Sequence, residues 1–388
     1  MALTSPDADR AVGRQITVQG IFGLIAGMGI GRFAFTPLLP VMTDAGVISS
    51  KEGAWIATAN YLGYLAGAVA LAAWPARNTR RHYQAWIAVL ALSEAAMALS
   101  QNALLLALLR VASGYASAVI FVGVVSTINH YRRAGASAGV AFGGVGLGIA
   151  IMGLFELTAG HILGWRWQWV AVAILTALSV SVAWRMDVRP EQSAASRAAT
   201  QRLSGDVRRA WWLLIAAYFL EGVGYIIIGT FMVAAAGGSS TMRSVVWLVA
   251  GLCAAPAAYS WHRLSRRFAL RKLLVIAYAM QVVSALLPVI SSGAAAAIIS
   301  AALFGGTFLG IAMMTLGQGA QLPIGRTAAV LTSAYGVGQV LGPLVVTPVI
   351  GTSFRLAYVI AAIIIVLAAV VSALFAVAAS KRGVLLVD

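Results

Sequence analysis

The sequence predicts an all-α membrane protein whose twelve transmembrane helices form two pseudo-symmetric six-helix bundles. Three observations support this prediction. Hydrophobic residues make up 61% of the 388 residues and charged residues only 10%, whereas soluble domains carry roughly 25% charged residues. The apolar runs have the length of about 20 residues that a helix needs to cross a bilayer. The second half of the chain also weakly repeats the first.

Polar or basic residues divide the chain into twelve expected spans. Residues 187–210 have no apolar face, so we expect a linker there, between a first bundle at 1–186 and a second at 211–388. The polar N-terminus runs directly into the first span, so no removable signal peptide is expected. The expected spans cover residues 15–41, 53–74, 82–100, 103–129, 135–160, 164–186, 211–235, 243–262, 271–290, 294–322, 327–350 and 354–379.

The basic residues fall unevenly on the two sides of these spans. Two arginines lie within spans, and nearly all the others fall on the side of the N-terminus. Basic loops stay in the cytoplasm, so we expect a protein of the inner or plasma membrane with both termini cytoplasmic. This asymmetry explains the formal net charge of +16 without nucleic-acid binding. The exceptions on the opposite side are Lys51, Arg166, Arg243 and Arg355.

The internal repeat rests on matches that occur in the same order in both halves. The segment WPARNTRR after the second span resembles WHRLSRR after the eighth. FGLIAGMGIG in the first span likewise parallels FLEGVGYIIIG in the seventh. Duplicated bundles of this kind are typical of transporters, whose binding site lies between the halves near the middle of the membrane.

Five ionisable residues lie inside expected spans, where a central Arg or Asp costs about 2.5–3.5 kcal/mol on insertion scales. Such residues face the bundle interior and pair with other groups. They are therefore the first candidates for a functional site. The five are Arg32, Glu94, Arg110, Glu156 and Glu221.

Glu94 and Arg110 flank a short hairpin at similar depth, so we expect that they can meet. They would form either a static ion pair or a pair in which protonation of Glu94 frees Arg110 for a substrate anion. Arg32 is expected to project into the central cavity or to pair across it with Glu94. Both substrate contact and a structural ion pair remain open for Arg32. The helix of Arg32 is expected to break at its outer end, at Pro37 and Pro40.

Glu221 is expected in the middle of the membrane with Tyr225 one turn further on, where it could carry a proton. The alternative is a lone acid bonded to a neighbouring backbone. Glu156, near the outer end of its span, is expected to extend toward water. Further polar candidates for a substrate site are Asn60, Tyr64 and Gln339.

The chain resembles the major facilitator superfamily, and within it the YbfB-type branch. The resemblance rests on GIGRFAFTPLLP around Arg32, ANYLGYLAGA around Asn60, FGGVGLGI in the fifth span, and the arginine–glycine motif from Arg110 to Gly114. It implies the superfamily fold. In the superfamily the basic loop after the second span is implied to hold the cytoplasmic ends of the two halves together through an ion pair. Here the loop WPARNTRR lacks the usual Gly and Asp, so the carboxylate of that ion pair is missing. The glycine–proline motif of antiporters is absent from the fifth span.

Together these features predict a secondary transporter for a small organic solute, which is anionic if the buried arginines contact it. Alternating access would be coupled to protons through Glu221 or Glu94. The expected substrate-binding residues are Arg32, Arg110, Asn60, Tyr64, Tyr225 and Gln339. Efflux of amphipathic or drug-like compounds is the nearest alternative, and a receptor or intramembrane enzyme is an alternative of another class. No nucleotide motif or metal cluster is evident, so we expect no cofactor, and the protein is expected to act as a monomer in lipid.

Overall fold

The computed structural model describes residues 6–189, 204–236, 239–324, 327–350 and 353–381. Within these ranges the regular structure is helical and contains no strand. The expected linker at 187–210 lies largely outside the described residues. Basic residues such as Arg326 that support the charge asymmetry also lie outside them.

The helices before residue 190 begin with α1 and end with α8. Their bounds are α1 Pro6–Leu24, the π-helix η1 Ile25–Ile30, α2 Phe35–Asp44, α3 Ser50–Ala73, α4 Arg80–Met97, α5 Ala103–His130, α6 Ala138–Ala141, α7 Gly143–Thr158 and α8 Trp165–Ala183, with short 3₁₀ turns η2 Pro75–Arg77, η3 Arg132–Ala134 and η4 Gly160–Ile162. The later helices are α9 Gly205–Ala235, α10 Ser240–Leu264, α11 Leu270–Ile290, α12 Ala294–Ala320, α13 Thr327–Ile350 and α14 Phe354–Ala378.

Eleven helical segments of the described chain are long and apolar enough to cross a membrane. The first of them combines α1, η1 and α2 over residues 8–44. The expected third span corresponds to α4, which has 18 residues and begins with Arg80, Arg81 and His82. This polar start lowers its mean hydropathy, so α4 is less apolar than the others. The protein is therefore an all-helical, multi-pass membrane protein.

The expected first span at 15–41 differs from the observed helix. The helix begins earlier, at Pro6, and is interrupted between η1 and α2 rather than at its prolines. Pro37 and Pro40 both lie inside α2. Proline is tolerated in the first turn of a helix, where its missing N–H would have no partner anyway. The interruption therefore precedes Pro37 and falls next to Arg32.

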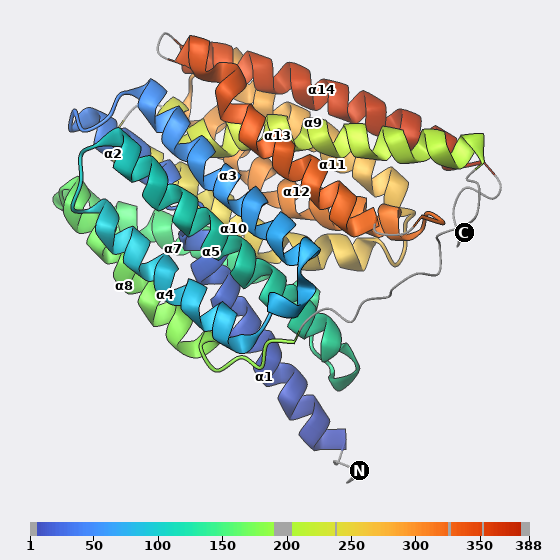
Figure 1. Cartoon of the computed structure of the whole chain (residues 1–388). Helices are drawn as coiled ribbons and strands as arrows, with labels where there is room; N and C mark the ends of the chain where they lie inside the picture. Colours follow the sequence, from blue (N-terminus) through green and yellow to red (C-terminus); the bar gives the residue numbers. More distant parts are fainter. Residues whose placement is uncertain (1–5, 190–203, 237–238, 325–326, 351–352, 382–388) are drawn as a thin grey trace.

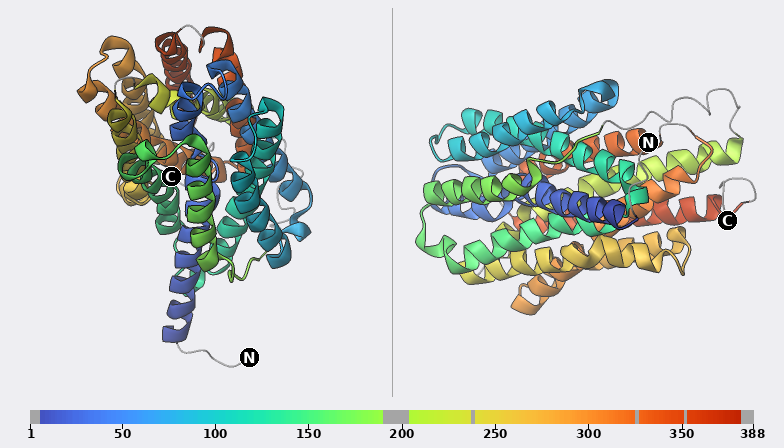
Figure 2. Two further views of the ribbon diagram at one scale, coloured as in Figure 1. Left: turned by 90° about the vertical axis from the view of Figure 1, so that its left-hand side faces the viewer. Right: turned by 90° about the horizontal axis from the view of Figure 1, so that it is seen from below.

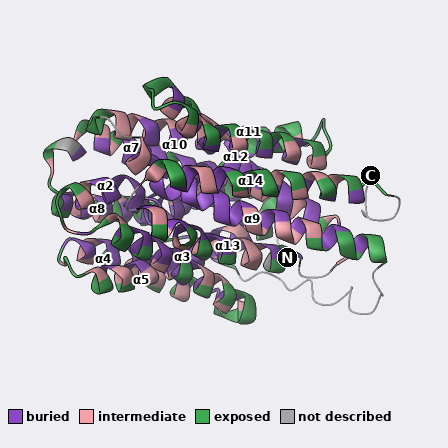
Figure 3. Cartoon of the chain, turned by 90° about the horizontal axis from the view of Figure 1, so that it is seen from above, coloured by how far each residue is buried: buried purple, intermediate pink, exposed green. Residues whose placement is uncertain are grey.

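Helices from the two parts of the chain pack against one another along their lengths. α10 packs on α7, α13 on α3, and α9 on α2. In Figure 1 α1 begins at the bottom of the picture and α14 ends at its right, and in the right-hand view of Figure 2 most helices run along one common direction. Buried residues gather between the helices and exposed ones on their outer faces (Figure 3). Many of the exposed residues are large and apolar, such as Leu92, Leu108 and Ile363, as expected for surfaces that meet lipid.

Close helix approach depends on glycine at particular positions. A Cβ atom added to Gly305 of α12 would lie 2.0 Å from the carbonyl oxygen of Ala250 in α10. Beyond its chain neighbours and the nearby backbone of its own helix, a Cβ added to the next residue, Gly306, would meet no described heavy atom within 4 Å. Small residues that allow backbones to approach are typical of membrane helix interfaces.

We predict opposite effects for alanine at these two adjacent positions. Gly305→Ala should lower the free energy of unfolding by about 1–3 kcal/mol, because the added methyl group overpacks a backbone contact. Gly306→Ala should be neutral or stabilise by up to about 1 kcal/mol, because alanine favours the helix. Thermal unfolding of the purified protein in detergent measures both. Equal melting temperatures for the two variants would contradict the observed α10–α12 contact.

Candidate functional site

The break in the first span begins with a π-helical turn. The N–H of Gly31 donates to the carbonyl of Ala26 at 2.7 Å, five residues back, and the chain then turns before α2 begins at Phe35. Pro37 has no N–H to give to the carbonyl of Phe33, and the N–H of Thr36 donates there instead, at 3.1 Å. The carbonyl of Arg32 thus loses its usual helical partner. Such local π-helices are often found at functional sites.

Arg110 of α5 satisfies the carbonyl groups that this break leaves free. Its Nη1 donates to the carbonyl oxygen of Gly31 and its Nη2 to that of Arg32, both at 2.8 Å. The guanidinium is 1% exposed. The planar fork of arginine suits two adjacent acceptors, which a lysine ammonium cannot match. Both terminal nitrogens of Arg110 are therefore engaged in holding the backbone at Arg32.

Two expected ion pairs of Glu94 are not present. Glu94 of α4 is 1% exposed, and in the described part of the chain its carboxyl oxygens have no hydrogen-bond partner. The carboxyl lies next to Thr176 of α8 and within electrostatic range of Arg110. Arg110 turns to the first span because two buried carbonyl groups there need donors. Arg32 does not pair with Glu94 either. The expected contact between Glu94 and Arg110 is thus corrected, and of the two alternatives for Arg32 the ion pair with Glu94 is not observed.

Arg32 instead lies between aromatic rings and an amide from the later part of the chain. Its side chain is 2% exposed, and Nη2 donates a hydrogen bond to Oε1 of Gln339 in α13. Its guanidinium carbon lies 4.2 Å from the ring centre of Tyr64 and 5.1 Å from that of Tyr61, both in α3. Cation–π contacts of this kind stabilise a buried cation. Sequence reasoning thus correctly grouped Arg32 with Tyr64 and Gln339.

Gln339 connects Arg32 to a set of parallel rings. Its Nε2 donates to the hydroxyl of Tyr225 in α9 at 3.1 Å. The ring of Tyr225 stacks on those of Phe304, Phe308 and Tyr335, with interplanar angles of 9–12°. The amide of Gln339 is thus oriented at both ends, with its oxygen toward the cation and its nitrogen toward the phenol.

Asn60 lies close to Arg32 but faces α5. Its Nδ2 donates to the carbonyl of Arg110 at 3.1 Å and to Oγ of Ser113 at 2.8 Å. Gly114 allows this approach, because a Cβ there would lie 2.0 Å from the carbonyl oxygen of Asn60. In this arrangement Asn60 fixes α3 against α5 and thereby the position of Arg110 along α3.

Glu221 and Glu156 lie apart from Arg32. Glu221 of α9 is fully buried next to Gln281 of α11, and among the described residues neither its carboxyl oxygens nor the amide atoms of Gln281 have a hydrogen-bond partner. Glu156 of α7 was expected to reach water, but it is only 7% exposed and packs against Gly160. The 3₁₀ turn η4 at Gly160–Ile162 folds back over its carboxyl group, which explains the difference.

Sequence reasoning missed several residues that join the two parts of the chain beside Arg32. The hydroxyl of Tyr61 lies 2.8 Å from that of Thr230 in α9, and Thr36 donates to the carbonyl of Gly229 at 3.1 Å. The ring of Phe33 packs against those of Trp247 and Phe308. Tyr61 lies three residues before the candidate Tyr64 on the same helix face, and this spacing could have identified Tyr61 from the sequence.

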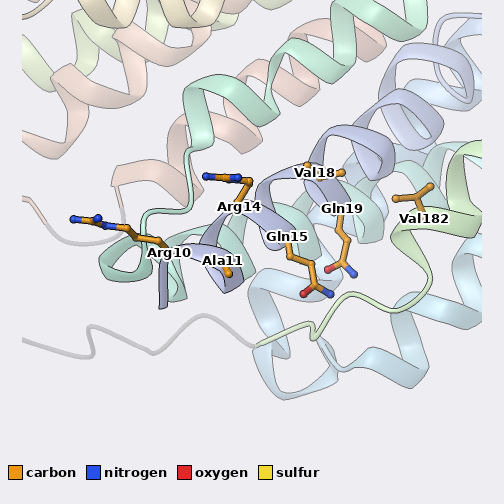
Figure 4. Close-up of a pocket in the computed structure, with 7 residues that line it drawn as sticks. All are labelled: Arg10, Ala11, Arg14, Gln15, Val18, Gln19 and Val182. Carbon is orange, nitrogen blue, oxygen red and sulfur yellow. The ribbon is translucent and has the colours of Figure 1, made fainter. Parts of the chain in front are cut away.

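A hollow of about 770 Å³ lies elsewhere, along the first turns of α1. Arg10 and Arg14 lie on one side of it and Gln15 and Gln19 on another (Figure 4). Val182 of α8 completes the lining. It shares no residue with the surroundings of Arg32, so it is a separate surface feature.

A family model described as "Uncharacterised MFS-type transporter YbfB" matches residues 24–373. The chain belongs to this family. The match includes the broken first span, Arg110 and Gln339, so the geometry around Arg32 lies within the part that defines the family. The protein is therefore a membrane transporter of the MFS type.

Other known proteins agree with this assignment. "Putative transporter AraJ" from Escherichia coli (strain K12) is 24% identical over 238 residues, which cover 58% of this chain and 59% of that protein. The match thus spans less than two thirds of that relative. Crystal structures of the nucleoside transporter NupG and of a point mutant of it are both 13% identical, with TM-scores of 0.68. They cover 96% and 94% of this chain and 100% and 99% of their own chains. At this identity they show that the fold is shared.

The clamp by Arg110 leads to a stability prediction. Arg110→Lys should lower the free energy of unfolding by about 1.5–3 kcal/mol, because an ammonium group cannot serve both carbonyls and one hydrogen bond to a charged group is lost. The matched control is Arg243→Lys at the exposed ion pair with Asp44, 2.8 Å long, where about 0–1 kcal/mol is expected. Thermal unfolding in detergent gives the comparison. Similar losses at both sites would contradict the clamp.

Proposed function

We propose that this protein is a proton-coupled secondary transporter that moves a small organic anion across the membrane by alternating access. The observation that supports this most directly is the position of Arg32. A buried cation from the first part of the chain is held by a neutral amide, that of Gln339, from the later part. A bound anion would compensate this charge, and a relative movement of the two parts would change its environment.

The proposed architecture is two six-helix bundles, at 1–186 and 211–388, joined by a linker at 187–210. Three contacts between the bundles lie beyond Arg32 on the side away from the chain ends. They are Thr36 with Gly229, Tyr61 with Thr230, and Arg243 with Asp44. This pattern supports a conformation that is closed outward.

Glu221 is the proposed proton carrier, and Glu94 is the second candidate. Each is buried, and each has carboxyl oxygens without hydrogen-bond partners among the described residues. An unpaired buried carboxylate is costly, whereas the neutral acid is tolerated. Both groups could therefore gain and lose a proton as their exposure changes during transport. Neither forms an ion pair that would fix its charge.

Transport assays in proteoliposomes test this proposal. With an imposed pH gradient, we expect saturable uptake of the transported anion by the unmodified protein. Glu221→Gln should abolish gradient-driven accumulation but retain exchange of labelled for unlabelled solute, because exchange needs no net proton movement. Arg32→Gln should abolish both, because the anion loses its partner.

The outcomes separate the roles of these residues. Gradient-driven accumulation that persists in Glu221→Gln would rule out Glu221 as the carrier and direct the same test to Glu94→Gln. Full activity in Arg32→Gln would overturn the anion site. Thr158→Ala, at an exposed position of α7, serves as the control variant and should behave as the unmodified protein.

The proposed topology, with both termini in the cytoplasm, has its own test. Cys253→Ser first removes the single native cysteine. In this background Ser292→Cys introduces a cysteine between α11 and α12, and Ser380→Cys introduces one after α14. Both serines are exposed. A membrane-impermeant maleimide should label the cysteine at 292 in intact cells and the one at 380 only after permeabilisation. The reverse pattern would invert the topology.

A further inference from the structure

The guanidinium of Arg32 has one side that the protein leaves unsatisfied. Nη2 donates to the single oxygen of the Gln339 amide, while Nε is buried and has no hydrogen-bond partner among the described residues. A carboxylate has two oxygens and can accept from Nε–H and Nη2–H together, in the bidentate geometry that arginine favours. Gln339 thus supplies one acceptor oxygen to an edge of the guanidinium, Nε–H and Nη2–H, that can bind two oxygens.

The charge around Arg32 restricts the ligand to one negative charge. No ion pair of Arg32 with a carboxylate occurs in the described ranges. Arg110, the neighbouring buried cation, already donates both terminal nitrogens to Gly31 and Arg32. A dicarboxylate or phosphate would bury a second charge without a partner, which is strongly unfavourable. A ligand amine would likewise find no acidic partner beside Arg32.

The rings on the far side of Gln339 indicate the shape of the rest of the ligand. Tyr225, Phe304, Phe308 and Tyr335 present nearly parallel ring planes, with the centre of the Tyr225 ring 5.2–6.2 Å from the other three. Tyr225 is also the hydrogen-bond partner of Gln339. A ligand group that displaces the Gln339 oxygen would therefore lie next to flat aromatic faces, which favour another planar ring.

We propose that the Arg32 site takes a planar aromatic monocarboxylate, with the carboxylate on Nε and Nη2 of Arg32 and the ring against Tyr225 and Phe308. This inference rests on the proposed function, because it assumes that the substrate binds at Arg32. It goes further by naming the charge and the shape of the substrate. Binding displaces the amide oxygen of Gln339 and satisfies the Nε–H that is now unpaired.

Four small probes test charge and shape on the purified, unmodified protein. Isothermal titration calorimetry should show that benzoate binds about tenfold more tightly than cyclohexanecarboxylate, its saturated counterpart. Benzamide, which lacks the charge, and phthalate, which carries two, should each bind at least about tenfold more weakly than benzoate. Equal binding of cyclohexanecarboxylate overturns the aromatic part, and equal or tighter binding of benzamide or phthalate overturns the monoanion part.

Two variants locate the binding. Arg32→Lys keeps the charge but loses the fork, so the dissociation constant for benzoate should rise about tenfold or more. Tyr225→Leu should weaken benzoate but leave cyclohexanecarboxylate nearly unchanged, which a general folding defect would not do. Thr158→Ala, at an exposed position of α7, should leave both constants unchanged. Benzoate binding that persists unchanged in Arg32→Lys would overturn the assignment to this site.

Failure of this inference can be distinguished from failure of the proposed function. If a pH gradient drives another anion through Glu221-dependent transport while benzoate does not bind, the aromatic class is wrong and the transporter proposal stands. If benzoate binds with the expected pattern but is not exchanged across proteoliposomes, the binding class stands and the proposed transport of such anions fails.

Discussion

The site depends on two hydrogen bonds from Arg110 to the backbone of the first span. A helix interrupted in the middle of a membrane exposes carbonyl groups that neither lipid nor neighbouring apolar side chains can satisfy. Arg110 donates to those of Gly31 and Arg32 at 2.8 Å, so both carbonyl groups have a donor from the protein itself. The same contact fixes the backbone of Arg32. The side chain of Arg32 is thereby directed toward α3 and α13.

The two buried arginines have different partners. Arg110 bonds to backbone groups of its own part of the chain, those of Gly31 and Arg32. Arg32 bonds to Gln339 of α13, across the contact between α3 and α13. Any separation of these helices removes that acceptor from a cation that is 2% exposed. The cost of leaving Arg32 unpaired is thus linked to the relative position of the two parts, and an anion could offset it in either position.

Most of the fold could be predicted from sequence, because hydropathy fixes the position and length of a membrane helix. The same reasoning named Arg32, Tyr64 and Gln339 as candidates for one cavity, and the structure places their side chains together. The reasoning failed for Glu94 and Arg110 because depth does not determine which way a side chain points. The π-helical turn η1 adds a residue to one turn and shifts the helix phase before Arg32. Only the contact between α5 and the turn after η1 reveals that two carbonyl groups, those of Gly31 and Arg32, rather than a carboxylate, receive the guanidinium of Arg110.

The position of Glu221 limits how a proton could affect an anion at Arg32. Tyr218 and Tyr225 lie about one turn to either side of Glu221 on α9, and both rings stack on Tyr335. These rings stand between the carboxyl group, which neighbours Gln281, and the Gln339 amide that bonds to Arg32. No direct ion pair therefore joins the two charges. Under the proposed function, coupling between them would pass through the packing of α9 against α13, where Gly222 and Gly338 bring the backbones into contact. A change of charge at Glu221 would thus act on the anion by moving a helix.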